Sequence, residues 1–260
     1  MNYGLYLSAS GVLTNMYRQD VYANNLANVQ TVGFKPDVPV ISQRPAEADE
    51  GSYPSQFHNA LLDQIGGGAL AGKQTLNLTP GPIRHTGNPT DVALTTANAF
   101  FAVQAKDAQG QSAVRLTRDG RFMVNAQGNL VTATDGLPVL GKDNQPITLK
   151  PNAPVTIGRS GQIYQDGQAV AQLQVTAVSD PRNLVKEGQD LLWSQSGADM
   201  RTPLANPTVV PEAVEGSGVD PIHDMMNLMA TSKAISMNAD MLHFEDDLMN
   251  QAVNVLGRVS

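Results

Sequence analysis

The C-terminal part of the chain carries the strongest constraint on the fold, an apolar position that recurs every seven residues. The recurring residues are Leu228, Ile235, Leu242, Met249 and Leu256. An unbroken heptad repeat of this length is typical of a helix that packs lengthwise against other helices. Asp220 followed by Pro221 favours a helix start, because aspartate can cap the first turn and proline is tolerated at the first helical position. At about 1.5 Å per residue, residues 221–256 would span roughly 54 Å, which is long for a small globular core.

A second helical pattern occupies the N-terminal part of the chain. Between residues 2 and 29 the apolar side chains fall at helical spacing without a proline. Gly11 is its weak point, since glycine inside a helix costs about 1 kcal/mol relative to alanine. Gly33 is suited to cap this helix, and Pro36 prevents it from resuming. We therefore predict a helix at each end of the chain.

Between the two ends the pattern changes to short β-prone runs separated by turn dipeptides. The turns carry Asp-Gly or Gly-Asn, at residues 119–120, 128–129, 135–136 and 166–167. Runs separated in this way predict an antiparallel domain of many short strands. We expect strands at residues 100–104, 114–117, 121–124, 129–133, 137–140, 155–157, 162–164 and 170–178.

The expected fold is mainly β with long α-helical termini. The N- and C-terminal helices pair as a coiled coil, and an antiparallel many-stranded β domain is inserted between them. Two stretches that contain prolines and glycines frame the β domain. The expected division is an N-terminal assembly helix, an irregular joint, the β domain, a linker and a C-terminal assembly helix, at residues 1–34, 35–80, 81–195, 196–219 and 220–260.

The charge balance excludes one broad class of partner. The 260 residues include 17 Lys and Arg against 24 Asp and Glu, for a net charge of −7, and no run of basic residues. A surface that binds nucleic acid needs clustered positive charge, so nucleic acid is not expected as a partner. No apolar run approaches the ~18 residues that span a bilayer, so no transmembrane segment is expected.

The chain contains no cysteine. This excludes disulfides, thiolate metal sites and thiol nucleophiles. It is compatible with the cytoplasm, and also with a protein that is exported unfolded and must not form cross-links. The N-terminus has no basic region followed by an apolar core, so we expect no cleaved signal peptide.

The titratable residues form no catalytic pattern. The histidines do not pair at His-x-x-x-His or His-Glu-x-x-His spacing: His58, His85, His223 and His243. Neither a Gly-x-Ser-x-Gly elbow nor a phosphate-binding loop occurs. The densest cluster could hold an acid/base pair or a cation, but we favour a solvated or partner-facing side of a helix: His243, Glu245, Asp246 and Asp247. We expect no enzymatic activity, no cofactor and no metal.

Residues 23–35 resemble the hallmark at the end of the first helix in flagellar axial proteins, the rod and hook subunits. The residues that carry the resemblance are Ala23, Asn24, Asn25, Leu26, Ala27, Asn28, Thr31, Gly33 and Phe34. Residues 86–104 resemble the start of that family's β domain, residues 116–132 its next hairpin, and residues 214–221 the approach to its C-terminal helix. The family usually has asparagine in place of Gly218, a mild departure because both residues tolerate the left-handed backbone.

The resemblance implies a structural subunit of the bacterial flagellar basal-body rod. Such subunits polymerise through their terminal helices and form the driveshaft that transmits torque to hook and filament. Their partners are other rod proteins, copies of themselves and the flagellar type III export apparatus. They lie in the periplasmic rod and are exported without a cleaved signal peptide. Residues 138–141 and 214–221 look more like a proximal rod subunit than a distal one.

Other interpretations are open at this point. The chain could be a distal rod or hook-type axial subunit, because the same motifs fit those proteins. It could also be a non-flagellar coiled-coil stalk or adhesin, whose helices would pair within a small oligomer. A β-rich enzyme flanked by helices would need a paired carboxylate site and usually more aromatic residues than the 5% found here.

Overall fold

The computed structural model of the chain divides into two compact units. The helical unit comprises Met1–Ala27, Asp37–Thr75 and Asp220–Ser260, and the β unit comprises Asn28–Pro36 and Leu76–Val219. The structure describes residues 3–45, 67–106, 110–151, 153–188, 191–194, 201–205 and 207–256. Residues 46–66, in the expected irregular joint, lie outside this description.

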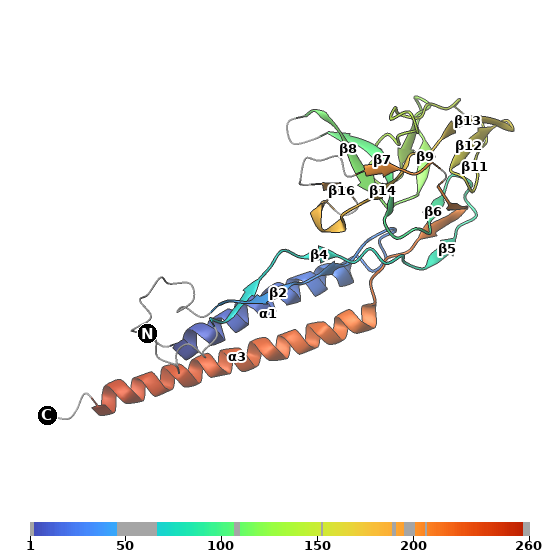
Figure 1. Cartoon of the computed structure of the whole chain (residues 1–260). Coiled ribbons are helices and arrows are strands. Elements are labelled where there is room, and N and C mark those ends of the chain that lie inside the picture. The colour runs from blue at the N-terminus through green and yellow to red at the C-terminus, as the bar shows by residue number, and fades with distance from the viewer. Residues whose placement is uncertain are drawn as a thin grey trace. The chain divides into compact units, whose positions relative to one another are not determined.

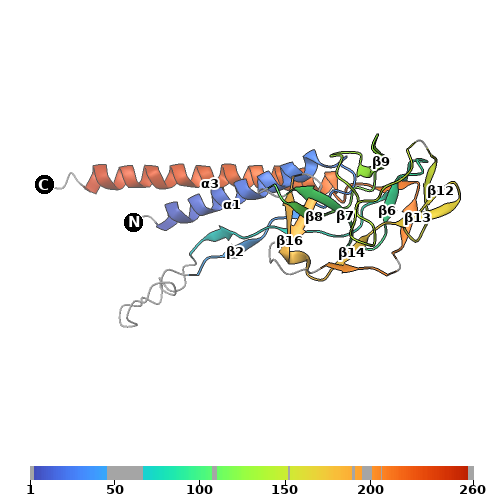
Figure 2. The ribbon, with the colours of Figure 1, turned by 90° about the horizontal axis from the view of Figure 1, so that it is seen from above.

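Two long helices dominate the helical unit. Helix α1 (Tyr3–Ala27) and helix α3 (Pro221–Leu256) lie side by side and run in opposite directions (Figures 1 and 2). Asp220 caps α3, because its Oδ1 accepts the backbone N–H groups of Ile222 at 3.1 Å and His223 at 3.2 Å. Both predicted helices are confirmed, and the first ends at Ala27, before the capping turn that follows.

Short strands accompany α1 in the helical unit. Strands β2 (Ile41–Gln43) and β3 (Ala69–Ala71) form an antiparallel pair, and β3 packs against α1. The Tyr17 hydroxyl of α1 donates to the carbonyl oxygen of Gly72 at 3.1 Å, directly after β3. Strands β1 (Asp37–Val38) and β4 (Thr75–Leu76) form a second two-stranded sheet. The sequence predicted an irregular joint here because of its prolines and glycines, whereas the structure has four strands of two or three residues in its described part.

The largest sheet of the β unit has six strands. Their order is β15 (Leu184–Glu187), β16 (Leu191–Ser194), β8 (Ser112–Thr117), β7 (Ala99–Lys106), β14 (Val175–Val178) and β17 (Arg201–Pro203). Every neighbouring pair is antiparallel; Phe101 of β7 lies opposite Thr117 of β8 on one side and Val175 of β14 on the other. A 3-10 turn, η2 (Pro181–Asn183), precedes β15.

Four smaller antiparallel sheets complete the β unit. They are β9 (Phe122–Val124) with β10 (Leu130–Thr132), β11 (Val155–Ile157) with β12 (Gln162–Gln165) and β13 (Gln168–Gln172), β6 (Val92–Leu94) with β18 (Val209–Pro211), and β5 (Ile83–His85) with β19 (Ala213–Glu215). Asp166 and Gly167 join β12 to β13 with φ values of 51° and 76°. Two positive φ angles match the right-handed twist of the strands, which explains the Asp-Gly turn predicted there.

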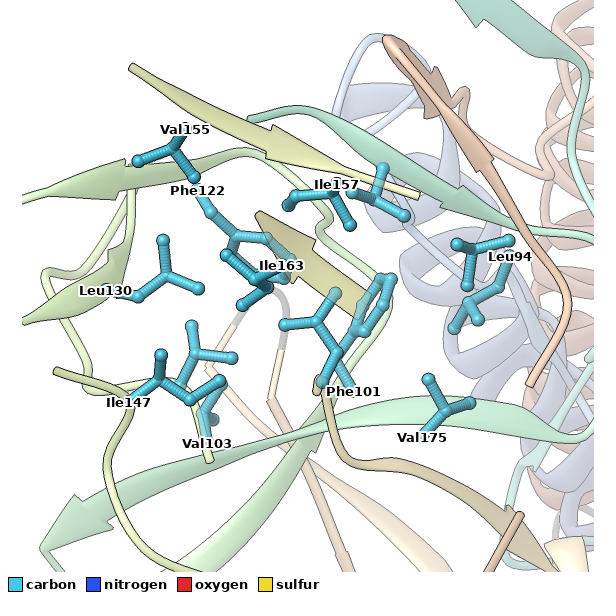
Figure 3. Packing of buried hydrophobic residues seen from close by; sticks show 14 of the residues in the cluster. Leu94, Phe101, Val103, Phe122, Leu130, Ile147, Val155, Ile157, Ile163 and Val175 are labelled. Atoms are coloured by element: carbon cyan, nitrogen blue, oxygen red, sulfur yellow. The ribbon is translucent and has the colours of Figure 1, made fainter. Parts of the chain in front are cut away.

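The β unit has its own apolar core. The side chains of the main cluster converge between the sheets, and the Phe101 and Phe122 rings meet edge to face with centroids 5.1 Å apart (Figure 3). Strand β7 supplies core residues from both of its faces. Phe101 and Val103 enter this cluster, and Phe100 enters a second cluster with Leu116. The predicted many-stranded antiparallel β domain is therefore confirmed. Among the described residues, no helix is long and apolar enough to cross a membrane.

Candidate assembly site

The face of α3 that meets α1 alternates apolar with polar side chains. The apolar residues Leu228, Ile235 and Leu242 are half-buried. The polar residues that alternate with them, at spacings of three and four, are Asp224, Thr231, Asn238 and Glu245. Asp224 and Thr231 are buried. Spacings of three and four keep all seven positions on one side of the helix. We call this face the seam of α3.

Glycines of α1 make room for the seam. A Cβ atom on Gly11 would lie 2.7 Å from Nδ2 of Asn238, and one on Gly4 would lie 2.2 Å from Oε1 of Glu245. Both distances are too short for ordinary contact, so a larger residue would push the α3 side chains away. In the sequence, Gly11 stands out only as a weak point of the helix. The structure gives the reason for it, a close approach between the two helices.

Asn25 of the predicted assembly motif fixes the chain that follows α1. Its side chain is 2% exposed; Nδ2 donates to the carbonyl oxygen of Asp37 at 2.9 Å, and Oδ1 accepts the Asp37 N–H at 2.9 Å. Asn25 also bonds the Asp224 side chain at the start of α3. Burial raises the pKa of Asp224, and the hydrogen bond from Asn25 opposes this shift.

The predicted stripe of α3 divides into two parts. Leu228, Ile235 and Leu242 belong to the seam, whereas Met249 is 44% exposed. Leu256 ends α3, and its side chain lies outside the described residues. Of the titratable cluster near the end of α3, Glu245 is half-buried in the seam, and His243, Asp246 and Asp247 are exposed.

Large apolar side chains are exposed on the outward sides of both helices. The outward face of α3, turned away from the seam, carries Ile222, Met226, Met229, Met237, Phe244 and Leu248. The outward face of α1 carries Leu5, Tyr6, Leu13 and Met16. All eight methionines in the part of the chain that the structure describes are between 44% and 67% exposed. Methionine is ordinarily among the more buried residues, and seven of these eight exposed methionines lie on α1 and α3.

The second half of the predicted motif lies in the β unit. Gly33 has a φ of 71°, and a Cβ atom there would lie 2.5 Å from the backbone carbon of Arg118. Its N–H donates to the carbonyl oxygen of Glu215 at 2.8 Å. The neighbouring Phe34 is 3% exposed, and Lys186 Nζ lies 4.0 Å from the centroid of its ring. Both the backbone conformation and the space therefore require glycine at position 33.

A buried charge cluster joins four segments of the β unit that are distant in the sequence. Oε1 of Glu215 accepts from Lys35 Nζ at 2.6 Å and from the Gly81 N–H at 2.8 Å, while Oε2 accepts from Arg118 Nη1 at 2.9 Å. The three charged side chains are between 1% and 2% exposed. Breaking such a buried pair leaves an uncompensated charge in a medium of low polarity. The cluster therefore stabilises the segment that follows α1 in the sequence and the segment that precedes α3.

The two cations of this cluster have further partners. Lys35 Nζ donates to the carbonyl oxygen of Thr79 at 2.9 Å, and Arg118 Nη2 donates to that of Thr96 at 2.6 Å. Burial lowers the pKa of Lys35, the positive charge of Arg118 adds to this shift, and Glu215 opposes it. Sequence reasoning missed Lys35, Arg118 and Glu215 as a group, although each lies within or beside one of the segments that resemble the axial family.

Three family models match successive parts of the chain. Residues 5–35 match the flagella basal body rod protein model, residues 96–165 the flagellar hook protein FlgE/F/G D1 domain, and residues 210–255 the flagellar basal body rod FlgEFG protein C-terminal model. Lys35, Arg118 and Glu215 each fall within a different one of these ranges.

Curated relatives match the chain over its whole length. The flagellar basal-body rod protein FlgF of Caulobacter vibrioides is 30% identical over 100% of both chains. FlgF of Mesorhizobium japonicum is 27% identical over 100% of both chains, and the rod protein FlgG of Agrobacterium fabrum is 28% identical over 94% of this chain and 95% of its own. The chain belongs to the flagellar basal-body rod protein family. It is a structural subunit of the rod and is located in the flagellar basal body.

Proposed function

We propose that this chain is a proximal-type rod subunit that polymerises through α1 and α3, with copies of itself and with other rod proteins. One observation carries the proposal: the helix pair exposes two different apolar faces, each directed away from the other helix. The FlgF name of full-length relatives supports the proximal type. A distal rod or hook-type role is the alternative that the FlgG relatives favour.

Two different faces on opposite sides of one helix pair favour an open polymer. A closed dimer needs a single self-complementary patch, whereas contacts between unlike patches build rings or helical filaments. The outward face of α3 in one copy can therefore cover the outward face of α1 in the next. Every subunit would then have a neighbour on each side, as a tube requires.

We infer that α1 and α3 pair as an antiparallel coiled coil. The alternating spacings of three and four along the seam support this interpretation, because they are the spacings of coiled-coil contact positions. The pair would then act as one stiff element that transmits torque from subunit to subunit. In this role the rod serves as the driveshaft for hook and filament.

The route to the rod is part of the same proposal. The chain would pass unfolded through the flagellar type III export apparatus to the periplasmic part of the rod, without a cleaved signal peptide. The absence of cysteine supports this route, because an unfolded chain without thiols cannot form disulfides in an oxidising compartment.

Substitutions on the outward face of α3 test the proposal. Met229→Asp and Met237→Asp place a carboxylate where we expect a dry contact, so cells should lose motility and basal bodies should lack a complete rod. The purified variants should keep the thermal transition of the β unit, since both residues are exposed in the free chain. Met229→Leu, which keeps the face apolar, and Met123→Asp, which adds charge to an exposed site of the β unit, should both leave cells motile.

The seam stripe is proposed as a further assembly determinant. Ile235→Asp or Leu242→Asp should also prevent rod formation, whereas Asp247→Ser on the exposed side of α3 should be tolerated. Normal swimming by Met229→Asp and Met237→Asp cells would reject the outward face as an assembly surface. Electron microscopy of the purified assemblies separates the flagellar role from a stalk or adhesin, because the latter would form discrete oligomers instead of a tube.

A further inference from the structure

Apolar contact alone does not fix how far along α1 the helix α3 is placed. The apolar seam residues Leu228, Ile235 and Leu242 are similar in size and repeat every heptad. Sliding α3 by one heptad would therefore present nearly the same apolar surface to α1. In coiled coils the register is commonly fixed by polar residues at contact positions instead.

The polar seam residues meet α1 in a single consistent register. Glu245 lies at Gly4 and Asn238 lies at Gly11, one heptad further along α1 and one heptad back along α3. The third pair is a hydrogen bond between Asn25 of α1 and Asp224 of α3. Asn25 lies two heptads after Gly11, and Asp224 lies two heptads before Asn238, so this pair has the same register. We infer that these three pairs are the residues that determine the register of the helix pair.

A shift of one heptad would break each pair. With Glu245 moved to Gly11, Asn238 would meet Arg18, a long side chain in place of the glycine gap. Asp224 would leave Asn25, although it is 8% exposed and needs a partner for its carboxylate. The seam thus tolerates apolar exchange but penalises displacement. All three pairs lie within one chain, so the register they fix does not depend on whether the outward faces polymerise.

The absence of cysteine makes the register directly measurable, because engineered thiols are the only ones present. Gly11→Cys with Asn238→Cys reports the register of the structure, since a Cβ atom on Gly11 would lie 3.2 Å from Cγ of Asn238. Gly11→Cys with Glu245→Cys reports a shift of one heptad. Both reporters are made in the full chain and oxidised mildly, and variants are compared at equal helix content by circular dichroism.

With Asp224 and Glu245 intact, the first reporter should cross-link. With Asp224 and Asn238 intact, the second reporter should stay at background. When those two residues are replaced by leucine, cross-linking of the shifted reporter should rise to a yield comparable with the first. The matched control adds leucine at exposed positions of the same helix, Asp240→Leu with Asp247→Leu, and should leave the shifted reporter at background.

Arg18→Gly gives an independent variant, because it opens a gap where Asn238 would sit after the shift. Cross-linking of the shifted reporter should rise in this variant as well, without any change in α3 beyond the reporter cysteine itself. A shifted reporter that stays at background in both the leucine and the Arg18→Gly variants would overturn the inference. It would mean that the connections to the β unit fix the register.

Discussion

The two units of the molecule bury different kinds of side chain. The main core of the β unit consists of apolar residues that are at most 7% exposed. In α1 and α3, the buried side chains among the described residues are Thr14, Val21, Asn25, Asp224 and Thr231, of which one is apolar. The β unit therefore carries its own stabilising core, while the described large apolar side chains of α1 and α3, apart from Val21, are half-buried or exposed. Such a distribution is expected where neighbouring chains complete the burial.

The comparison predicts that a leucine-to-alanine substitution lowers the free energy of unfolding by different amounts in the two units. Leu130→Ala, at a residue with 0% exposure in the β core, should lower the free energy of unfolding by about 2–5 kcal/mol. Leu242→Ala, in the half-buried seam, should cost about 1 kcal/mol because fewer contacts are lost. Urea denaturation followed by Trp193 fluorescence and by far-ultraviolet circular dichroism measures both. Equal losses would show that the helices have a core as dense as that of the β unit.

Removal of the buried carboxylate tests the polar part of the β unit. Glu215→Gln keeps the shape but leaves Lys35 and Arg118 without a counter-charge, so the free energy of unfolding should fall by about 3 kcal/mol. Glu187→Gln, at a carboxylate whose side chain is 42% exposed beside Arg115, is the matched control and should cost less than about 1 kcal/mol. Similar denaturation midpoints for the two variants would argue against a stabilising role for the cluster.

A smaller effect is expected from the cap of α3. Asp220→Ala removes the acceptor of the Ile222 and His223 N–H groups, which should cost about 1 kcal/mol of helix stability. The loss should appear in the thermal transition of the helical circular dichroism signal and not in Trp193 fluorescence. Asp240→Ala, at an exposed site inside the same helix, should leave both signals unchanged. An equal shift of the thermal transition followed by Trp193 fluorescence would mean that the two units unfold together.

The smallest effect is the pH dependence of the helix pair. Because burial raises the pKa of Asp224 above its usual 3.8 in the folded chain, the folded state binds this proton more tightly than the unfolded one. Helix stability should therefore be greatest below pH 3.8 as far as this group is concerned, and decrease as the pH rises through the raised pKa. Asp224→Asn should remove this dependence, while Asp247→Asn should retain it. Thermal melts recorded at steps of about one pH unit, from about pH 3 to about pH 7, measure this dependence.

Sequence periodicity predicted the features that depend on local pattern. The Asp-Pro signal and the heptads located α3, and the β-prone runs located strands such as β7, β9 and β10. The charge cluster escaped prediction because Lys35 and Glu215 are 180 residues apart in the chain. The polar seam escaped prediction because the heptad repeat is visible only in its apolar positions. Strands such as β5 and β18 have three residues each and take their conformation from their partners.

The exposed methionines of α3 have a consequence for the choice of neighbour. Methionine is unbranched, with three rotatable bonds and a polarizable sulfur, so it adapts its shape at little energetic cost. A rod built from several related but unequal chains needs subunits that accept more than one kind of neighbour. A face formed by Met226, Met229 and Met237 can repack around each of them, where branched side chains would fit one shape alone. The flexible thioether side chains would then allow one subunit to pack against neighbouring subunits of different sequence.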